Sequence, residues 1–263
     1  MLEIAASLNA LGVLLAVAFA GWLASLAKRD VSLVDSLWSL LFLLALVVYA
    51  AAMAGELERR GFIVLALVTV WALRLSIYLT WRNHGKPEDR RYAAMRQRHK
   101  PGFAWKSLYL VFGLQAILAW IIAAPLAAAA SGRAPLGWLD AAAVALWAFG
   151  FVFETLGDAQ LARFKADPAN RGRVMDLGLW HYTRHPNYFG EACLWWGYWL
   201  FAVAAGGAWT VFAPLLMTAL LLKVSGVALL EKDIAERRPG YRDYIVHTNA
   251  FVPGPPRVER GGG

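Results

Sequence analysis

Seven stretches of about 20 or more mostly apolar residues recur along the 263-residue chain, separated by short polar and mostly basic segments. A helix needs about 20 such residues to cross a hydrocarbon core of about 30 Å, so each stretch predicts a membrane-spanning helix. The predicted spans cover residues 4–27, 31–53, 62–82, 105–130, 137–158, 188–205 and 210–231. Because 59% of the residues are hydrophobic and only 17% are charged, the composition excludes an ordinary soluble domain. We therefore expect an all-α integral membrane protein with seven transmembrane helices, formed as a single domain over residues 1–263.

The positions of Lys and Arg predict the orientation of these spans. Most of the 26 Lys and Arg residues fall in segments 28–29, 82–106 and 163–184 and from residue 232 onward. The segments that alternate with them hold only Arg59, Arg60 and Arg133. Cytosolic loops are enriched in Lys and Arg, so we expect the N-terminus outside and the C-terminus in the cytosol. The net charge of +8 then belongs to loops beside anionic membrane lipids and to an anionic ligand, and we expect no nucleic acid partner.

Ionisable residues inside the predicted spans are costly and usually face a cavity or a partner. They are Asp35, Arg74, Glu154, Asp158, Glu191, Lys223 and Glu231. In the predicted topology all of them fall in the cytosolic half of their helices, which indicates a polar cavity open to the cytosol. Structural ion pairs, such as Arg74 with Asp35 or Lys223 with Glu231, are the alternative explanation.

The segment from Trp180 to Glu191 places hydrogen-bond donors, aromatic rings and an acid directly before a span. Pro186 suits the first turn of a helix, so we expect Asn187 to Glu191 to begin the sixth span. Arg184 and His185 then lie beside the free backbone N–H groups of that helix, and such a helix start favours anions and phosphates. This segment is the predicted chemical centre.

The same segment resembles a superfamily of membrane enzymes: the steroid 5-alpha-reductases, the sterol C14 and C7 double-bond reductases, and the isoprenylcysteine carboxyl methyltransferases. Arg-His-Pro-x-Tyr-x-Gly is shared across them. Asn-Tyr-x-Gly followed by an acid is typical of the reductases, and the methyltransferases usually differ at the positions of Asn187 and Glu191. The landmarks at 31–38, 71–75, 89–92, 157–160 and 224–231 are similar to a bacterial branch of steroid-5-alpha-reductase-like proteins. The resemblance implies an enzyme of the bacterial inner membrane whose active site faces the cytosol.

The resemblance also implies an NADPH site without a Rossmann domain, within residues 82–258. In the steroid reductases the Asn and the acid of the motif contact NADPH, which assigns this role here to Asn187, Tyr188 and Glu191. Asp158 matches a further cofactor-binding acid, whereas the family's Asn one turn earlier is Glu154 here, so the role of Glu154 stays open. The other residues assigned to the cofactor are Arg90, Arg91, Lys165, Arg173, Tyr182, Arg184, His185 and Glu231. The cations among them suit phosphates, and ordinary positive-inside residues are the alternative for Arg90, Arg91, Lys165 and Arg173.

Reduction of an enone requires a hydride at the β-carbon and an acid at the carbonyl oxygen. The resemblance places a carboxyl group on an early helix and a Tyr on the next helix at that oxygen. Asp35 fits the carboxyl group, and burial would keep it protonated and able to donate. Tyr78 and Tyr92 are the candidates for the Tyr, because Trp71 occupies the aligned position. Trp38 and Trp71 are the candidates for an apolar wall around the substrate, and core packing is the alternative for Trp38.

We therefore expect an oxidoreductase that uses NADPH to reduce a carbon–carbon double bond in a steroid-like or other lipophilic enone drawn from the bilayer. The alternative is an S-adenosylmethionine-dependent methyltransferase of a lipidic or prenylated substrate, a class in which paired acids are usual at the position of Glu231 and Lys232. A lipid-binding or transporter-like protein fits the intramembrane charges but not the motif. Because Cys193 is the only cysteine, we expect no disulfide within the chain and no metal site. The sequence indicates no oligomeric state.

Overall fold

The computed structural model describes residues 4–53, 55–224, 238 and 240–257, and all regular secondary structure in these residues is helical. The chain divides into two compact units. The first comprises Met1–Asp140 and Trp199–Ala213, and the second comprises Ala141–Tyr198 and Pro214–Gly263. The all-α expectation is confirmed for the described residues.

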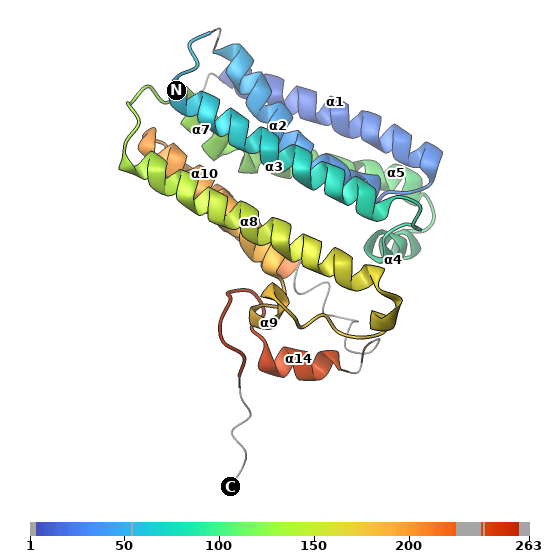
Figure 1. Cartoon of the computed structure of the whole chain (residues 1–263). Helices are drawn as coiled ribbons and strands as arrows, with labels where there is room; N and C mark the ends of the chain where they lie inside the picture. Colours follow the sequence, from blue (N-terminus) through green and yellow to red (C-terminus); the bar gives the residue numbers. More distant parts are fainter. Residues whose placement is uncertain (1–3, 54, 225–237, 239, 258–263) are drawn as a thin grey trace. The chain divides into compact units, whose positions relative to one another are not determined.

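In the first unit, α2 packs against both α1 and α3, and the helices that follow α4 pack against these three (Figure 1). The elements are α1 (Ile4–Lys28), α2 (Leu33–Ala52), α3 (Arg59–Asn83), α4 (Arg90–Arg98), α5 (Phe103–Ser107), η1 (Leu108–Gly113), α6 (Leu114–Ile122), α7 (Ala124–Ser131) and η3 (Ala208–Val211). Large apolar side chains such as Leu14, Phe42, Trp71 and Phe112 are fully buried between these helices. The apolar sequence of the spans therefore supplies a core as well as a lipid-facing surface.

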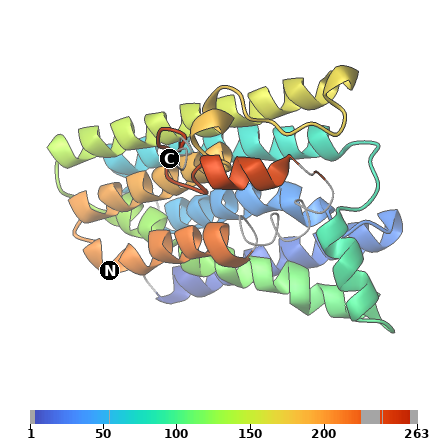
Figure 2. The same ribbon diagram turned by 90° about the horizontal axis from the view of Figure 1, so that it is seen from below.

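In the second unit, two long helices, α8 and α10, lie side by side, and α9 and α14 lie near the start of α10 (Figures 1 and 2). The elements are α8 (Trp138–Ala166), which begins in the first unit, η2 (Pro168–Asn170), α9 (Leu179–Tyr182), α10 (Pro186–Ala204), α11 (Phe212–Ala219), η4 (Leu220–Val224) and α14 (Tyr241–His247). As predicted, Pro186 is the first residue of α10.

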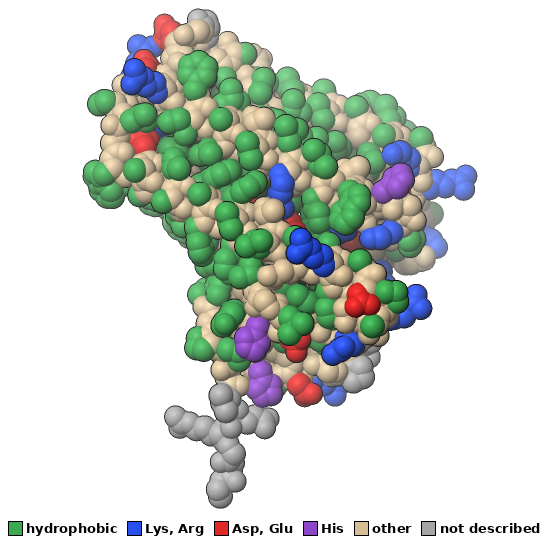
Figure 3. All heavy atoms as spheres, in the orientation of Figure 1, with side chains coloured by type: hydrophobic (Ala, Val, Ile, Leu, Met, Phe, Trp, Pro, Cys, Tyr) green, Lys and Arg blue, Asp and Glu red, His purple; other side chains and the backbone are tan. Residues whose placement is uncertain are grey.

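Five helical segments are long and apolar enough to cross a membrane, and they coincide with the first five predicted spans. They are Ile4–Lys28, Leu33–Ala52, Arg59–Asn83, Phe103–Ser131 and Trp138–Ala166. Large hydrophobic side chains such as Leu8, Phe19, Phe62 and Ile77 are exposed on α1 and α3, as lipid-facing helices require, and Figure 3 shows hydrophobic side chains spread over one face of the molecule. These features support the prediction of a membrane protein.

The number of spans and the orientation remain predictions. The sixth predicted span is α10, which has 19 residues, and the segment Ala208–Lys223 is a shorter apolar helix. The rest of the seventh predicted span, from residue 225 onward, lies outside the described residues.

One ion pair joins the starts of α3 and α8 within the first unit. Arg60, expected in a loop, lies in the first turn of α3 and is only 1% exposed. Its Nε and Nη2 donate to the two carboxylate oxygens of Asp140 at 2.6 and 2.9 Å, and it also donates to the carbonyl oxygens of Ala134 and Pro135. Because both charges are buried, losing one partner would leave the other uncompensated, at a cost of about 3 to 5 kcal/mol.

Candidate functional site

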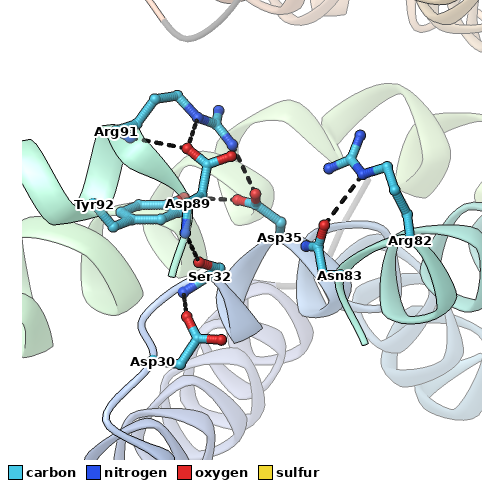
Figure 4. A network of polar contacts seen from close by, with 8 residues as sticks. All are labelled: Asp30, Ser32, Asp35, Arg82, Asn83, Asp89, Arg91 and Tyr92. Atoms are coloured by element: carbon cyan, nitrogen blue, oxygen red, sulfur yellow. Dashed lines mark hydrogen bonds and ion pairs between the residues drawn. The ribbon is translucent and has the colours of Figure 1, made fainter. Parts of the chain in front are cut away.

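The first candidate cluster, in the first unit, consists of Asp35, Asp89, Arg91 and Tyr92 (Figure 4). Asp35 lies in the first turn of α2, and Arg91 and Tyr92 lie in the first turn of α4. Nη2 of Arg91 donates to Oδ2 of Asp35 at 2.7 Å, and the Tyr92 hydroxyl donates to Oδ1 at 2.6 Å. Two predicted site residues, Asp35 and Tyr92, are thus in direct contact.

Asp89 holds Arg91 in this position from the other side. It is the N-cap of α4, and its Oδ1 accepts from the backbone N–H of Arg91 at 2.9 Å and from Nε of Arg91 at 3.0 Å. The backbone N–H of Asp89 in turn donates to Oγ of Ser32 at 2.7 Å, which ties the start of α4 to the start of α2. Together these contacts join the connection after α1 and the first turn of α2 to the connection after α3 and the first turn of α4.

A second ion pair, between Glu88 and Arg96, stabilises the connection after α3, and Glu88 also bonds to the connection after α1. Arg96 donates through Nε and Nη2 to the two carboxylate oxygens of Glu88 at 2.9 and 2.6 Å, and Oε1 of Glu88 also accepts from the backbone N–H of Val31 at 3.0 Å. Burial by itself raises the pKa of Glu88, but the hydrogen bonds from Arg96 and Val31 outweigh it and lower that pKa. The pKa of Asp89 is lowered in the same way, because burial is outweighed by the charge and hydrogen bonds of Arg91.

Both oxygens of Asp35 accept hydrogen bonds, one from Arg91 and one from Tyr92. Burial, and then the negative charge of Asp35, raises the pKa of Tyr92 well above its usual value, so Tyr92 stays protonated at neutral pH. In the contact between these two residues the Tyr92 hydroxyl is the donor and Asp35 is the acceptor.

The other predicted substrate-side residues lie on α2 and α3. The Trp38 ring meets Phe42 edge-on with centroids 4.9 Å apart, and the Phe42 ring lies 5.9 Å from the ring of Trp71, which is 0% exposed. Trp71 is therefore part of the helix core, whereas Trp38 is only half-buried. Tyr78 is half-buried, and the guanidinium of Arg82 lies 5.9 Å from the centre of its ring.

The second candidate cluster, in the second unit, lies where α8 and α10 approach most closely. A Cβ on Gly190 would lie 2.5 Å from the backbone nitrogen of Glu154 and 2.6 Å from the carbonyl oxygen of Gly150. A Cβ on Gly157 would lie 3.2 Å from the backbone nitrogen of Asn187. Glycine at these positions lets the two backbones touch, which brings the first turns of α10 against the middle of α8.

This approach gathers four polar side chains, Glu154 and Asp158 of α8 with Asn187 and Glu191 of α10, here called the α8–α10 cluster. The three acids are between 2% and 8% exposed. Nδ2 of Asn187 donates to Oδ1 of Asp158 at 3.2 Å. The Oδ1 of Asn187 is buried, and in the described part of the chain no group donates a hydrogen bond to it. Two predicted cofactor residues thus meet, and one presents a buried acceptor.

The segment before α10 is held by the C-terminal segment, residues 241–257. The Tyr244 hydroxyl donates to the carbonyl oxygen of Trp180, whose indole N–H donates to the carbonyl oxygen of Gly157 at 3.0 Å. The Thr183 hydroxyl donates to the carbonyl oxygen of Phe251 at 2.8 Å, and the N–H of Gly254 donates to a carbonyl oxygen of α9 at 3.1 Å. The C-terminal segment therefore fixes the chain that leads into Asn187.

Arg184 belongs to the same set of contacts. Its Nη1 donates to the carbonyl oxygens of Ile245 and Thr248, at the end of α14, and its backbone N–H donates to the carbonyl oxygen of Asn249 at 2.9 Å. Those carbonyls carry the partial negative charge of a helix C-terminus, which a guanidinium stabilises. Arg184 is 7% exposed and holds the end of α14, and its role beside phosphates stays a prediction.

The remaining predicted cofactor residues are scattered. His185 is buried, with its ring stacked on Tyr188 at 5.4 Å between centroids. Tyr182, Lys165 and Arg173 are exposed in the second unit, and Arg90 is exposed on α4 in the first. Arg91 is committed to Asp35 and Asp89. Glu231 lies outside the described residues.

Residues 21–248 match the family model described as "Protein of unknown function (DUF1295)". The chain belongs to this family. DUF1295 is part of the steroid 5-alpha-reductase-like superfamily, which agrees with the resemblance at superfamily level and selects no branch within it. A curated relative, Uncharacterized protein C594.04c of Schizosaccharomyces pombe, is 29% identical over 262 residues that cover 88% of this chain and 75% of the relative. No solved structure matches the chain.

The sequence did not reveal several residues that support the two clusters in this DUF1295 chain. It did not assign Asp89 or Glu88, whose signal is an acidic pair directly before a basic helix, an arrangement typical of an N-cap. It also missed the C-terminal segment, where Tyr244 carries no signal of its own because its partner is a backbone carbonyl.

Proposed function

We propose that the protein is an NADPH-dependent reductase of a carbon–carbon double bond in a lipophilic, steroid-like enone. The observation that carries the proposal is the amide of Asn187, whose Nδ2 donates to Asp158 and whose buried Oδ1 is an acceptor without a donor in the described residues. Membership of a steroid 5-alpha-reductase-like superfamily supports the same reaction class.

The donor set of the α8–α10 cluster fits a dihydronicotinamide nucleotide. A buried acceptor needs an N–H or O–H partner, and the carboxamide of a nicotinamide offers an N–H group of matching size. The bond to Asp158 fixes which way the Asn187 amide faces, so the acceptor is oriented before a ligand arrives. The buried carboxylates of Glu154 and Glu191 suit hydroxyl groups, such as those of a ribose.

The nucleotide phosphates need cations. The proposal assigns them to Lys165, in the last turn of α8, and to Arg173, which follows α8, because both side chains are exposed. NADPH would supply the hydride, and the protein would bind and orient it and exclude water from it.

The carbonyl end of the enone is assigned to the Asp35 contact. The proposal gives Tyr92 the role of hydrogen-bond donor to the carbonyl oxygen, because its hydroxyl stays protonated and is desolvated. In this structure that single hydroxyl proton donates to Asp35, so the carbonyl oxygen would replace Asp35 as its acceptor. Asp35, itself held by Arg91, acts as a positioning residue that orients Tyr92 until the substrate binds. A lipophilic substrate reaches a protein of this kind through the bilayer that its apolar helices face.

The decisive experiment uses the purified full chain in lipid nanodiscs. We expect saturable NADPH binding, and loss of absorbance at about 340 nm when a 4-ene-3-oxosteroid is added. Asn187→Ala removes the acceptor and should weaken NADPH binding by at least about tenfold. Asn9→Ala, at an exposed position of α1, is the matched control and should bind normally. Saturable binding of S-adenosylmethionine without any affinity for NADPH would overturn the proposal in favour of a methyltransferase.

A further inference from the structure

Helix α4 has two chemically different faces. Arg91, Tyr92 and Arg96 are buried or half-buried and bond to acids of the connections around α4. The exposed residues Arg90, Ala94, Gln97 and Arg98 recur at spacings of four, seven and eight, which puts them on one helical face. The exposed face carries arginine at both ends and no acid.

The acidic side chains around α4 already accept hydrogen bonds from other groups of the first unit. Asp35 and Asp89 bond to Arg91, Glu88 bonds to Arg96, and Asp30 accepts from the backbone N–H of Ser32. Six exposed cations remain that pair with no carboxylate in the described part of the chain: Lys28, Arg29, Lys86, Arg90, Arg98 and Lys100. Figure 3 shows Lys and Arg side chains gathered at the end where Figure 1 places α4.

Exposed aromatic side chains accompany these cations. Trp81, at the end of α3, is 65% exposed, and Trp105 and Tyr109, which follow α4, are 69% and 61% exposed. Trp22 of α1 contacts the Trp105 ring at 5.2 Å, and its indole N–H donates to the carbonyl oxygen of Ala104, so α1 and α5 meet at this end. Trp and Tyr concentrate at the level of lipid headgroups, where one edge of the ring is apolar and the other is wet.

We propose that anionic phospholipid headgroups bind the exposed face of α4 through Arg90 and Arg98. Charge selects this occupant, since a surface of uncompensated arginine and lysine beside interfacial aromatic rings complements phosphate esters, to which guanidinium groups donate in pairs. Because Arg90, Arg91 and Tyr92 belong to the same short helix, a headgroup bound to the outer face also steadies the inner face, through which Arg91 and Tyr92 contact Asp35. The inference does not depend on the reaction proposed above.

The test compares nanodiscs of phosphatidylcholine with nanodiscs containing about one third phosphatidylglycerol. For the unaltered chain we expect a higher Tm and slower amide hydrogen exchange in α4 with phosphatidylglycerol, and retention of that lipid in native mass spectra. Each neutralised arginine should lower the preference for the anionic lipid about fivefold, so Arg90→Gln with Arg98→Gln should lower it roughly 25-fold. Raising NaCl from about 0.1 M to about 1 M should have the same direction of effect, since the screening length falls from about 10 Å to about 3 Å.

Two further variants separate the local effect from general ones. Arg59→Gln with Arg171→Gln removes the same charge from exposed sites elsewhere and should keep the lipid preference. Ala94→Glu keeps both arginines and places a carboxylate between them at spacings of four, so it should lower the preference without a loss of fold. Equal behaviour of the unaltered chain in both lipids, or an equal loss in the Arg59 control, would overturn the proposal. So would a drop in NADPH affinity of the Arg90 variant that is the same in pure phosphatidylcholine, because the face would then bind nucleotide phosphate.

Discussion

Replacing Gly190 by alanine tests whether backbone contact between α8 and α10 builds the candidate cofactor site. The new Cβ would lie 2.5 Å from the nitrogen of Glu154, and an ordinary contact begins at 3.4 Å, so the helices must separate by about 0.9 Å. Both nearest atoms belong to the backbone of α8, so no side-chain rotation relieves the clash. Overpacking of this kind costs about 1 to 3 kcal/mol, and a rigid neighbour favours the upper end. For a chain of this size we expect a fall in Tm of about 6 to 12 °C.

The same separation should disrupt nucleotide binding. Moving α10 by about 0.9 Å lengthens the contact from Asn187 to Asp158 from 3.2 Å to about 4.1 Å, beyond hydrogen-bonding distance. The assay is thermal unfolding in detergent, followed by NADPH titration of the folded protein. Gly12→Ala is the matched control, because its Cβ meets nothing within 4 Å and a helical Gly→Ala change there stabilises by about 0.4 to 1 kcal/mol. A Gly190→Ala protein as stable as the unaltered chain would refute the argument.

Three other outcomes follow from named contacts. Tyr244→Phe removes the hydroxyl that donates to Trp180, so it should destabilise the fold by about 1 kcal/mol and raise the Kd for NADPH, whereas an equal Kd in both proteins would contradict the role of the C-terminal segment. Asp35→Asn should lower kcat at least about tenfold while NADPH affinity changes less than about twofold, which a full kinetic and binding comparison checks. The pKa values of Glu88 and Asp89 are lowered on folding. The stabilisation from these two carboxylates is therefore present above a pH of about 4.5 and is lost as pH falls through the lowered pKa values. After correction for intrinsic rates, amide hydrogens of α4 should exchange faster at a pH of about 3 than at about 6.

The hydropathy pattern predicted the apolar part of the fold and not the ends of its helices. The predicted span 137–158 became a helix that continues to Ala166, and α4 formed inside a segment that was read as a loop. Hydropathy reports where a chain can contact lipid, whereas a helix ends where backbone hydrogen bonding ends. In α4 that bonding is supported by Asp89 as the cap and by a distant residue, Ser32, whose hydroxyl accepts from the backbone of Asp89, and no periodicity reveals such a partner.

The role of Arg184 could not be deduced from residue type. An arginine beside a helix start suits a bound phosphate, and it suits equally the carbonyl oxygens at the end of another helix, because both present negative charge. The contacts of Arg184 with the carbonyl oxygens of Ile245 and Thr248 depend on the placement of α14, more than 50 residues later in the chain, which the sequence does not show. The sequence therefore leaves two partners open for Arg184, a bound phosphate and the carbonyl oxygens of another helix.

The α8–α10 cluster, by contrast, is encoded locally on each helix. Gly150 and Gly157 are seven residues apart on α8, as are Gly190 and Gly197 on α10, so each helix carries two glycines on one face. A Cβ on any of the four would lie 2.5 to 3.2 Å from an atom of the other helix, which makes the shared face the closest approach of the pair. Asn187 precedes Gly190 by one turn, so the spacing that allows the approach also aims the amide at α8. No local sequence pattern predicts the Asp35 contact, because Arg91 and Tyr92 reach Asp35 only when hydrogen bonds join the connection after α1 to the connection after α3. Substitutions in those two connections should therefore alter the hydrogen bonds that Asp35 accepts from Arg91 and Tyr92, and they should leave the Asn187 amide in place.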